Sequence, residues 1–167
     1  MRAKFSAVVA MNRNNVISID GKIPWHHSQD LKNFRKLTWG HIVLMGRNTF
    51  DSIGKPLKGR FNVVLTGRGL MTKPNVAAID GSFITSLQYS YGGEVFIIGG
   101  AKVYKQTADI VSRIYLTVID DTQDSSSSAL YFPWAAFGSS SWTVTKQEQW
   151  KGALYIILDK KYENSNT

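Results

Sequence analysis

The stretch Ile42–Phe50, which reads IVLMGRNTF, joins a short and uninterrupted apolar run to a turn that contains glycine. The runs at 62–65 (NVVL) and 95–98 (VFII) end in the same way, in TGRG and in GGAKVY. Apolar runs without alternation are typical of strands that are buried on both faces. The pattern therefore predicts an α/β fold, with a mostly parallel sheet between layers of helices.

Apolar runs and amphipathic segments alternate along the rest of the chain. Strands are expected at 5–11, 42–45, 62–65, 76–79, 95–98 and 114–119, and helices at 28–38, 47–52, 82–89 and 101–108. The C-terminal part differs, because SWTVTKQEQW and ALYIILDKKY flank Lys151-Gly152, which is a hairpin signal. The sheet is therefore expected to be mixed, with an antiparallel finish.

No internal repeat or linker divides the chain, so a single domain spanning 1–167 is expected. The polar stretch 121–130 is expected to form a surface loop, and the tail 163–167 is expected to be frayed.

The composition excludes several classes of protein. The chain has 167 residues, 43% of them hydrophobic, and contains no cysteine. Disulfides and thiolate metal sites are therefore excluded, and a reducing cytoplasm is the expected location. No window approaches about 18 uninterrupted apolar residues, so no membrane-spanning helix is expected. The run FSAVVAM is too short for a signal-peptide core and is better interpreted as a buried strand.

The net charge is +8, from 20 lysines and arginines against 12 acidic residues. Such a balance favours anionic partners such as nucleic acids, phosphorylated cofactors and polycarboxylates. The basic residues are scattered, however, with no run of five like charges and no nucleic-acid-binding motif. A basic nucleic-acid-binding module is therefore an alternative that the sequence disfavours.

Three glycine turns that follow predicted strands are candidate phosphate sites. In open α/β sheets, ligands bind beyond the carboxyl ends of the strands, where helix N-termini present free N–H groups. Gly46–Thr49 and Gly99–Lys102 fit that geometry, and Gly67-Arg68 would add a third contact. Each turn alone is a weak signal, since glycine there is usually only a turn residue. Together they favour a phosphate-rich nucleotide, although the G-x-G-x-x-G pattern is absent.

Asp30 is the one acid within IPWHHSQDLKNF (23–34), and it has two interpretations. It can be a first-turn acid of a helix that Ser28 caps, where a negative charge suits the helix dipole. It can also be a catalytic or ligand-anchoring acid in an apolar cleft. The residues alone favour the first interpretation by about two to one.

Two other kinds of catalytic site are not expected. The histidines at positions 26, 27 and 41 lack the spacing and the companion acids of a zinc site. A G-x-S-x-G nucleophile elbow and a cysteine nucleophile are both absent from the sequence. Few acids besides Asp30 lie near the apolar strand ends, and one buried carboxylate beside phosphate sites suits a cationic or amidine-like heterocycle.

The chain resembles the dihydrofolate reductase family along nearly its whole length. The resemblance is carried by AVVAMNRNNVI, IPWHHSQDLKNFRKLT, VLMGRNTFDSIGKPLKGRFNVVLT, VFIIGGAKVY, IYLTVID and YFP, which occur in the family's order and spacing. It implies a mostly parallel eight-stranded sheet with an antiparallel C-terminal hairpin and about four helices. It also implies an oxidoreductase of one-carbon metabolism that is an antifolate target.

The activity that the resemblance implies is reduction of 7,8-dihydrofolate to 5,6,7,8-tetrahydrofolate with NADPH, by hydride transfer to C6 and protonation of N5. A cytoplasmic monomer that needs neither nucleic acid nor a membrane is expected. A related reductase on the same fold, acting on another pterin or on a ribosylated pyrimidine, is a second enzymatic alternative, which the series Trp25, Asp30 and Phe34 disfavours.

Matched motif by motif, the resemblance implies roles for individual residues. Asp30, Trp25 and Thr117 would form the catalytic set, with Thr117 bonded to Asp30, and Arg60 would pair with the substrate's α-carboxylate. The apolar substrate contacts would be Val8, Leu31, Phe34, Ile53 and Leu57. The cofactor contacts would be Ala10, Ile17, Gly46, Arg47, Asn48, Thr49, Thr66, Arg68, Ile98, Gly99, Gly100, Ala101, Lys102, Val103 and Tyr104. The resemblance further implies a cis Gly99–Gly100 bond and a closing loop at 12–25.

The chain departs from the family pattern at a few positions. Ala101 replaces the family's third glycine, which would crowd the pyrophosphate, and Ser18 stands in the closing loop where glycine is common. His27 replaces a usually apolar residue, so the rim of the cleft is expected to be more polar. The acid often found just before YFP is missing from SSSSALYFP, which leaves the preferred state of the closing loop open.

Overall fold

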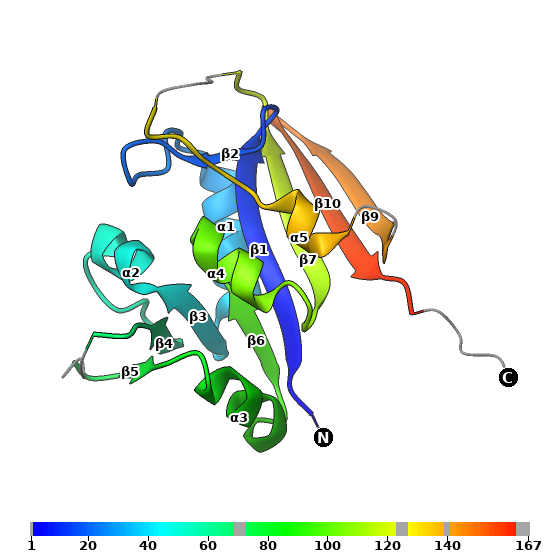
Figure 1. Cartoon of the computed structure of the whole chain (residues 1–167). Coiled ribbons are helices and arrows are strands. Elements are labelled where there is room, and N and C mark those ends of the chain that lie inside the picture. The colour runs from blue at the N-terminus through cyan, green and yellow to red at the C-terminus, as the bar shows by residue number, and fades with distance from the viewer. Residues whose placement is uncertain (1, 69–72, 123–126, 139–140, 163–167) are drawn as a thin grey trace, which may run out of the picture.

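The computed structural model describes residues 2–68, 73–122, 127–138 and 141–162. Within them, one eight-stranded sheet runs through the molecule in the order β5-β4-β3-β6-β1-β7-β10-β9 (Figure 1). Its strands are β1 (Lys4–Asn12), β3 (Ile42–Gly46), β4 (Phe61–Leu65), β5 (Val76–Ile79), β6 (Glu94–Ile97), β7 (Val111–Ile119), β9 (Trp142–Trp150) and β10 (Ala153–Lys160). The helices are α1 (Ser28–Thr38), α2 (Arg47–Ile53), α3 (Phe83–Ser90), α4 (Ala101–Thr107) and α5 (Trp134–Phe137). A second, two-stranded sheet joins β2 (Val16–Ser18) to β8 (Leu130–Tyr131).

The pairing of the strands confirms a mixed sheet with an antiparallel finish. β1 is central and pairs in parallel with both β6 and β7, and β3 pairs in parallel with β4 and β6. β10 is antiparallel to β7, and β9 is antiparallel to β10. The hairpin turns at Lys151-Gly152, where Gly152 takes a left-handed φ of 74° that glycine adopts without strain.

The sheet is buried on both faces, as the uninterrupted apolar runs predicted. In β3 the consecutive residues Val43, Leu44 and Met45 are all 0% exposed. Since neighbouring side chains of a strand point to opposite faces, this requires a hydrophobic layer on each side. Leu44 belongs to one cluster, while Val43 and Met45 belong to the other.

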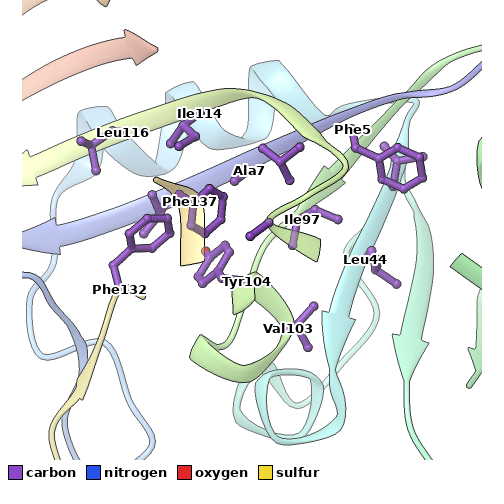
Figure 2. Close-up of a cluster of buried hydrophobic side chains, with 14 of the residues drawn as sticks. Phe5, Ala7, Leu44, Ile97, Val103, Tyr104, Ile114, Leu116, Phe132 and Phe137 are labelled. Carbon is purple, nitrogen blue, oxygen red and sulfur yellow. The ribbon is translucent and has the colours of Figure 1, made fainter. Parts of the chain in front are cut away.

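The two hydrophobic layers are built by different helices. Figure 2 shows the first, in which Val103 and Tyr104 of α4 point toward side chains of the central strands. Phe132 and Phe137 complete this cluster, with their rings stacked at a centroid distance of 5.0 Å. The second layer contains Phe50 of α2, and Leu37 of α1 packs against it. Figure 1 shows α1 and α4 on opposite sides of β1.

Most predicted elements are confirmed, and the omissions are short. The predicted helix 28–38 matches α1, and the other predicted strands and helices agree to within a few residues at each end. The sequence missed β2, β8 and α5, which have three, two and four residues and carry too little periodicity to recognise. Part of the predicted polar loop at 121–130, and the whole tail 163–167, lie outside the described residues.

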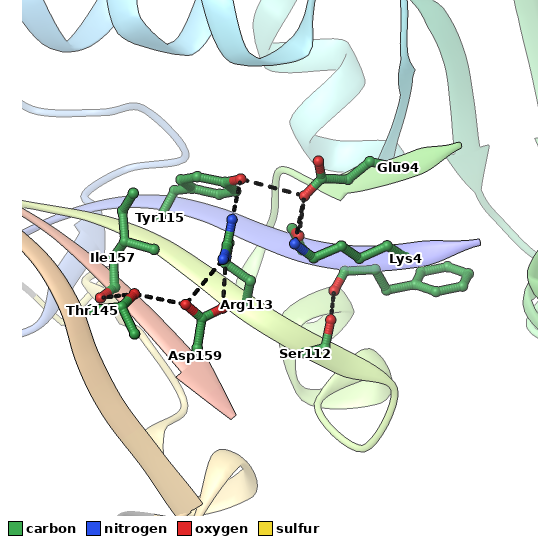
Figure 3. Close-up of polar contacts among 10 residues, drawn as sticks. Lys4, Glu94, Ser112, Arg113, Tyr115, Thr145, Ile157 and Asp159 are labelled. Atoms are coloured by element: carbon green, nitrogen blue, oxygen red, sulfur yellow. Dashed lines mark hydrogen bonds and ion pairs between the residues drawn. The ribbon is translucent and has the colours of Figure 1, made fainter. Parts of the chain in front are cut away.

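A polar cluster at the amino ends of the parallel strands lies opposite the glycine turns (Figure 3). Arg113 forms a bidentate ion pair with Asp159, at 2.6 and 3.0 Å, and Thr145 donates to the same carboxylate at 2.6 Å. Beside them, Tyr115 donates to Glu94 at 3.5 Å, and Lys4 lies 3.9 Å from the Glu94 carboxylate. This cluster fastens the start of β1 and β6 to the end of β10.

Two further observations limit the chemistry of the chain. Across the part of the chain that the structure describes, no helix has the length and apolar character needed to cross a membrane. The described side chains also contain no group of three or more His, Cys, Asp or Glu residues that would hold a metal ion.

Candidate active site

The carboxyl end of β7 and the first turn of α1 meet at a partly buried hydrogen bond. Thr117, which is only 2% exposed, donates its hydroxyl to Asp30 Oδ1 at 2.6 Å. Thr117 pairs with Ala10 across the ladder between β1 and β7, so Asp30 lies beside the central strand of the sheet. The hydrogen bond that the resemblance implied between Thr117 and Asp30 is therefore present.

The environment of Asp30 disfavours its charged form. Burial raises the pKa of its carboxyl group above the usual range, while the hydroxyl of Thr117 and the nearby His27 ring partly offset that rise. A carboxyl group held in this way, with one polar partner and a helix N-terminus beside it, suits a ligand that brings its own N–H donors. The arrangement supports the ligand-anchoring interpretation of Asp30.

The start of α1 differs from the prediction that Ser28 caps it. The N-cap is His27, which has extended backbone angles (φ −130°, ψ 104°) and accepts the N–H of Asp30 on Nδ1 at 3.2 Å. Ser28 is instead the first helical residue, and its hydroxyl lies 3.5 Å from His26 Nε2. The first-turn position of Asp30 is confirmed, and it is compatible with the ligand-anchoring interpretation, which stays a prediction.

Apolar side chains from several elements surround this acid. Val8, Trp25, Ile53 and Leu57 are partly buried against the same hydrophobic cluster that contains Tyr115 of β7. Leu31, directly after Asp30 on α1, leaves 49% of its surface exposed. Its exposure is compatible with a contact to a ligand beside Asp30.

Arg60 is a cation held without a carboxylate partner among the described residues. Its Nη1 donates to Thr38 Oγ1 at 3.1 Å, and its guanidinium lies 5.9 Å from the centre of the Phe34 ring. Its Nε is buried and has no hydrogen-bond partner within the described chain. Burial, and then the positive charge of Arg35, lower the pKa of Arg60, as expected for a cation that lacks its anion.

The backbone that carries Arg60 is fixed from beneath by Asn62. The Asn62 side chain accepts the N–H of Leu57 at 2.9 Å and donates to the carbonyls of Leu57 and Arg60, each at 3.1 Å. Asn62 is 1% exposed, so these bonds are shielded from water. The segment that the resemblance assigned to the far end of the substrate is therefore rigid.

The glycine turns after β3 and β6 meet at the other side of the acid. The N–H of Gly46 donates to the carbonyl of Gly99 at 2.9 Å, and the Gly99–Gly100 peptide bond is cis, as the resemblance implied. A Cβ at Gly46 would come within 3.1 Å of Val103 Cγ2, and one at Gly100 within 3.4 Å of Thr49 Oγ1. Gly46 therefore has little room for a side chain, and the two turns form a glycine cradle ahead of α2 and α4 that fits a bound phosphate chain.

Tyr104 connects this cradle to the central strand. Its hydroxyl donates to the carbonyl of Val8 at 2.6 Å, and the residue is 3% exposed. Burial raises the pKa of the Tyr104 phenol, and the negative charge of Asp30 raises it further. Tyr104 therefore stays protonated and holds α4 beside β1.

The predicted phosphate-binding cations lie on the surface around the cradle. Arg47 forms an ion pair with Asp51 one turn along α2, with Nε 3.2 Å from the carboxylate. Both side chains are well exposed, so this pair is weak and exchanges readily for another anion. The N–H of Arg68 donates to Thr66 Oγ1 at 3.1 Å, which shapes the turn after β4. Lys102 is exposed at the start of α4.

The segment 12–25, which is predicted to close over the site, contacts β8 and the residues just before it. This strand was not predicted from the sequence. Asn12 Oδ1 accepts the N–H groups of Asn14 and Val16, at 2.9 and 3.0 Å, and Val16 then pairs with Tyr131 across the small sheet. Asp20 and Ser128 exchange hydrogen bonds at 3.3 and 2.5 Å. Ser128, from the segment that precedes YFP, thus contacts the loop predicted to close over the site.

Comparison with known proteins gives one consistent result. The sequence model of the family described as "Dihydrofolate reductase" matches residues 4–156. A dihydrofolate reductase of Staphylococcus aureus is 44% identical over 117 residues, covering 69% of this chain and 70% of the relative. One from Bacillus subtilis is 35% identical over 149 residues, covering 86% of this chain and 83% of the relative.

A solved structure shows the same fold. It is a dihydrofolate reductase from Enterococcus faecalis complexed with NADP(H) and RAB-propyl, and its TM-score is 0.82 at 24% identity. The likeness covers 97% of this chain and 99% of that one, so it extends over both the sheet and the C-terminal hairpin.

Proposed function

Because the chain belongs to the dihydrofolate reductase family, we propose that its substrate lies between Asp30 and Arg60 and its cofactor along the glycine cradle. The chain is an oxidoreductase that reduces 7,8-dihydrofolate to 5,6,7,8-tetrahydrofolate with NADPH, a reaction of one-carbon metabolism and a target of antifolates. The single observation that carries the proposed placement is the partly buried Asp30–Thr117 hydrogen bond beside the central strand.

Asp30 anchors the pteridine in this proposal. A carboxylate accepts two N–H donors side by side, which matches the 2-amino group and N3 of the pteridine ring. Thr117 occupies one lone pair of Oδ1 and so fixes the plane of the carboxylate. Asp30 lies too far round the ring to hand a proton to N5 directly. It orients the ring and favours the protonated form, while water delivers the proton.

Arg60 binds the α-carboxylate of the substrate's glutamate. The buried Nε without a partner among the described residues supports this role, because a bidentate carboxylate would satisfy it. The pKa of Arg60, lowered by burial and by Arg35, supports it as well, since an anion there would relieve the repulsion between the two cations. Leu57 lies on the same rigid segment and covers the aromatic middle of the substrate.

The glycine cradle and the loops around it bind NADPH, which supplies the hydride when bound. The hydrogen bond between the two glycine turns and the start of α4 directly after Gly100 support this placement, because backbone N–H groups at a helix start suit a phosphate. Arg47 and Arg68 are placed for the 2′-phosphate. We expect Arg47→Ala to weaken NADPH by about 1.5–3 kcal/mol and NADH hardly at all, since one charge-assisted contact is lost. Equal losses for both cofactors, measured by fluorescence titration, would remove Arg47 from this role.

The activity is tested by following NADPH oxidation with and without dihydrofolate. We expect oxidation only when dihydrofolate is present, and no comparable turnover with other oxidised pterins or with a ribosylated aminopyrimidine. A faster reaction with one of those compounds would assign the chain to a related reductase on the same fold. NADPH oxidation without any acceptor would contradict the proposed activity.

We further propose a single domain that acts as a monomer in the cytoplasm, without a nucleic-acid partner. One sheet shared by both hydrophobic clusters supports the single domain. The scattered positive charge supports the absence of a nucleic-acid partner. Light scattering after gel filtration, and a gel shift at physiological salt, test these statements. A dimer mass or a shifted DNA band would overturn them.

A further inference from the structure

His27 joins the first turn of α1 to the C-terminal hairpin. Its Nδ1 accepts the N–H of Asp30 at 3.2 Å, and its Nε2 lies 2.9 Å from the carbonyl oxygen of Lys151 in the hairpin turn. Its ring stacks on Trp150 at 6.2 Å with an interplanar angle of 24°, and Trp150 stacks in turn on Tyr155 at 4.6 Å. The side chain therefore bridges two elements that are far apart in sequence.

The two hydrogen bonds of His27 determine its protonation state. A backbone N–H only donates, so Nδ1 must keep its lone pair, and a carbonyl oxygen only accepts, so Nε2 must carry the hydrogen. Both conditions hold only in the neutral ring with hydrogen on Nε2. A proton added at Nδ1 would face the N–H of Asp30 and would remove the helix cap. Histidine is the usual side chain for a change of charge near neutral pH.

The titratable groups on His27's own segment and on the elements that meet it come from six places in the fold. They are Asp30 on α1, His26 before it, Lys146 and Glu148 on β9, Lys151 in the turn, Tyr155 on β10 and Asp120 after β7. The Glu148 carboxylate forms an ion pair with Lys146 at 2.8 Å and accepts the indole N–H of Trp150 at 3.1 Å. Asp120 forms an ion pair with Arg13 at 2.8 Å. Of these acids, Asp30 is the one for which the described residues supply no ion pair, and it is the one that interacts with His27 directly.

We propose that neutral His27 is a positioning residue for Asp30, and that its protonation releases the first turn of α1 and weakens the binding of dihydrofolate. The proposal rests on the proposed function of Asp30. It adds a second link, because Asp30 is fixed at its side chain by Thr117 and at its backbone by His27. Neither the carboxylate nor the substrate has to change its charge for this link to respond to pH.

The link is tested first without any ligand. The amide signal of Asp30 is followed by NMR from about pH 8 to about pH 5 in the wild type, in His27→Asn and in the matched control His26→Asn. Asparagine caps helices well but does not titrate, so it separates the cap from the charge. We expect the Asp30 amide to shift with the midpoint of the His27 ring in the wild type and in His26→Asn, and to lose that step in His27→Asn. An unchanged step in His27→Asn would overturn the proposal.

The consequence for binding is tested with the same variants and with His27→Ala. We expect His27→Ala to raise the KM for dihydrofolate about three- to tenfold at mildly alkaline pH, because the cap is lost, with little change in kcat. His27→Asn should restore a KM close to that of the wild type and should lack the wild type's rise in KM toward acid pH. An identical rise in both proteins would assign the titration to Asp30 or the substrate and overturn the proposal.

The two tests separate this proposal from the proposed function. If the Asp30 amide follows His27 but Asp30→Asn leaves turnover unchanged, the proposed function of Asp30 fails, and the positioning role for dihydrofolate fails with it. If Asp30→Asn abolishes turnover but the Asp30 amide ignores His27, only the positioning role is overturned.

Discussion

One face of β7 carries polar side chains at both ends. A charged group is paired with an opposite charge at one end but not at the other. Arg113, Tyr115 and Thr117 lie on the same face because side chains of a strand alternate, and Arg113 and Thr117 are about 13 Å apart. At the amino end, Arg113 meets Asp159 in a bidentate pair (Figure 3). At the carboxyl end, Thr117 meets Asp30, for which the described residues supply no cationic partner.

The directions of the pKa shifts express this difference. At the amino end, the hydrogen bond with Arg113 lowers the pKa of Asp159, and the same bond raises the pKa of Arg113, so each group stabilises the other's charge. At the carboxyl end, burial raises the pKa of Asp30, so its charge is disfavoured. Burial also lowers the pKa of Arg60, which directly precedes the start of β4 and so lies toward the amino edge of the sheet. Charged groups that pair with one another stabilise the fold, whereas charged groups without partners indicate a ligand-binding site.

The largest expected effect concerns the carboxyl end. Asp30→Asn preserves the shape of the side chain but removes the charge that favours a protonated pterin. We expect the hydride-transfer rate at neutral pH to fall about 10²- to 10⁴-fold, or roughly 3–5 kcal/mol of barrier. The rate should recover as the pH drops, because solvent then protonates N5 without help. Single-turnover kinetics against pH measure this effect, with a melting curve to check that the variant is folded. A folded variant with near-wild-type rate would leave Asp30 only its place at the helix start.

The second expected effect concerns the unpaired cation. Arg60→Lys keeps the charge but loses the planar fork that grips a carboxylate. We expect glutamate-bearing ligands, both dihydrofolate and antifolates with the same tail, to bind more weakly by about 1.5–3 kcal/mol, or about 10- to 100-fold. Small diaminopyrimidines that lack the tail serve as the control, and their affinity should hardly change. Equal losses for both ligand classes would show that Arg60 acts on the fold instead.

A smaller effect is expected at the amino end, and on a different property. Arg113→Met keeps most of the aliphatic contact but breaks the pair with Asp159, whose side chains are 31% and 28% exposed. We expect the free energy of unfolding to fall by about 1 kcal/mol, since solvent screens part of the interaction. The KM for dihydrofolate should stay at the wild-type value. Urea denaturation measures the first quantity, and a changed KM would mean that the two ends of β7 are coupled.

The smallest expected effect is on the melting temperature, which two matched substitutions of aspartate by asparagine should shift in opposite directions. Asp159 has a lowered pKa, so its ionisation stabilises the fold above its unfolded pKa, and that stability is lost as the pH falls through the folded pKa. Asp30 has a raised pKa, so the fold binds its proton more readily than the unfolded chain does, and its ionisation costs stability as the pH rises. At neutral pH we therefore expect Asp159→Asn to lower the melting temperature and Asp30→Asn to raise it slightly.

Both differences from the wild type should shrink on acidification, when the carboxyl groups become protonated in folded and unfolded chains alike. Melting curves over a pH series measure them. Shifts of the same sign at neutral pH would contradict the contrast between the two ends of the strand.

The sequence predicted the glycine turns and the acid correctly, but not the residue that caps the helix carrying the acid. The turns Gly46–Thr49 and Gly99–Lys102 follow buried strands, and parallel strands bring their carboxyl ends to one edge, so their meeting at the Gly46–Gly99 hydrogen bond follows from local pattern. The resemblance added Thr117 as the partner of Asp30, which the structure confirms. The cap of α1 was predicted wrongly, because Ser28 is the residue type that usually caps and histidine rarely does.

The sequence by itself determined where the strands and helices lie, because an uninterrupted apolar run and the glycine after it act within a few residues. Only the tertiary structure decided which charges are satisfied. Asp159 is 46 residues from Arg113, and Lys151 is 124 residues from His27, so no local sequence pattern predicts either contact. Whether a carboxyl group is paired, or buried without a cation, depends on which distant elements the fold packs against it. The difference between the structural and the functional end of β7 is therefore a property of the packed molecule.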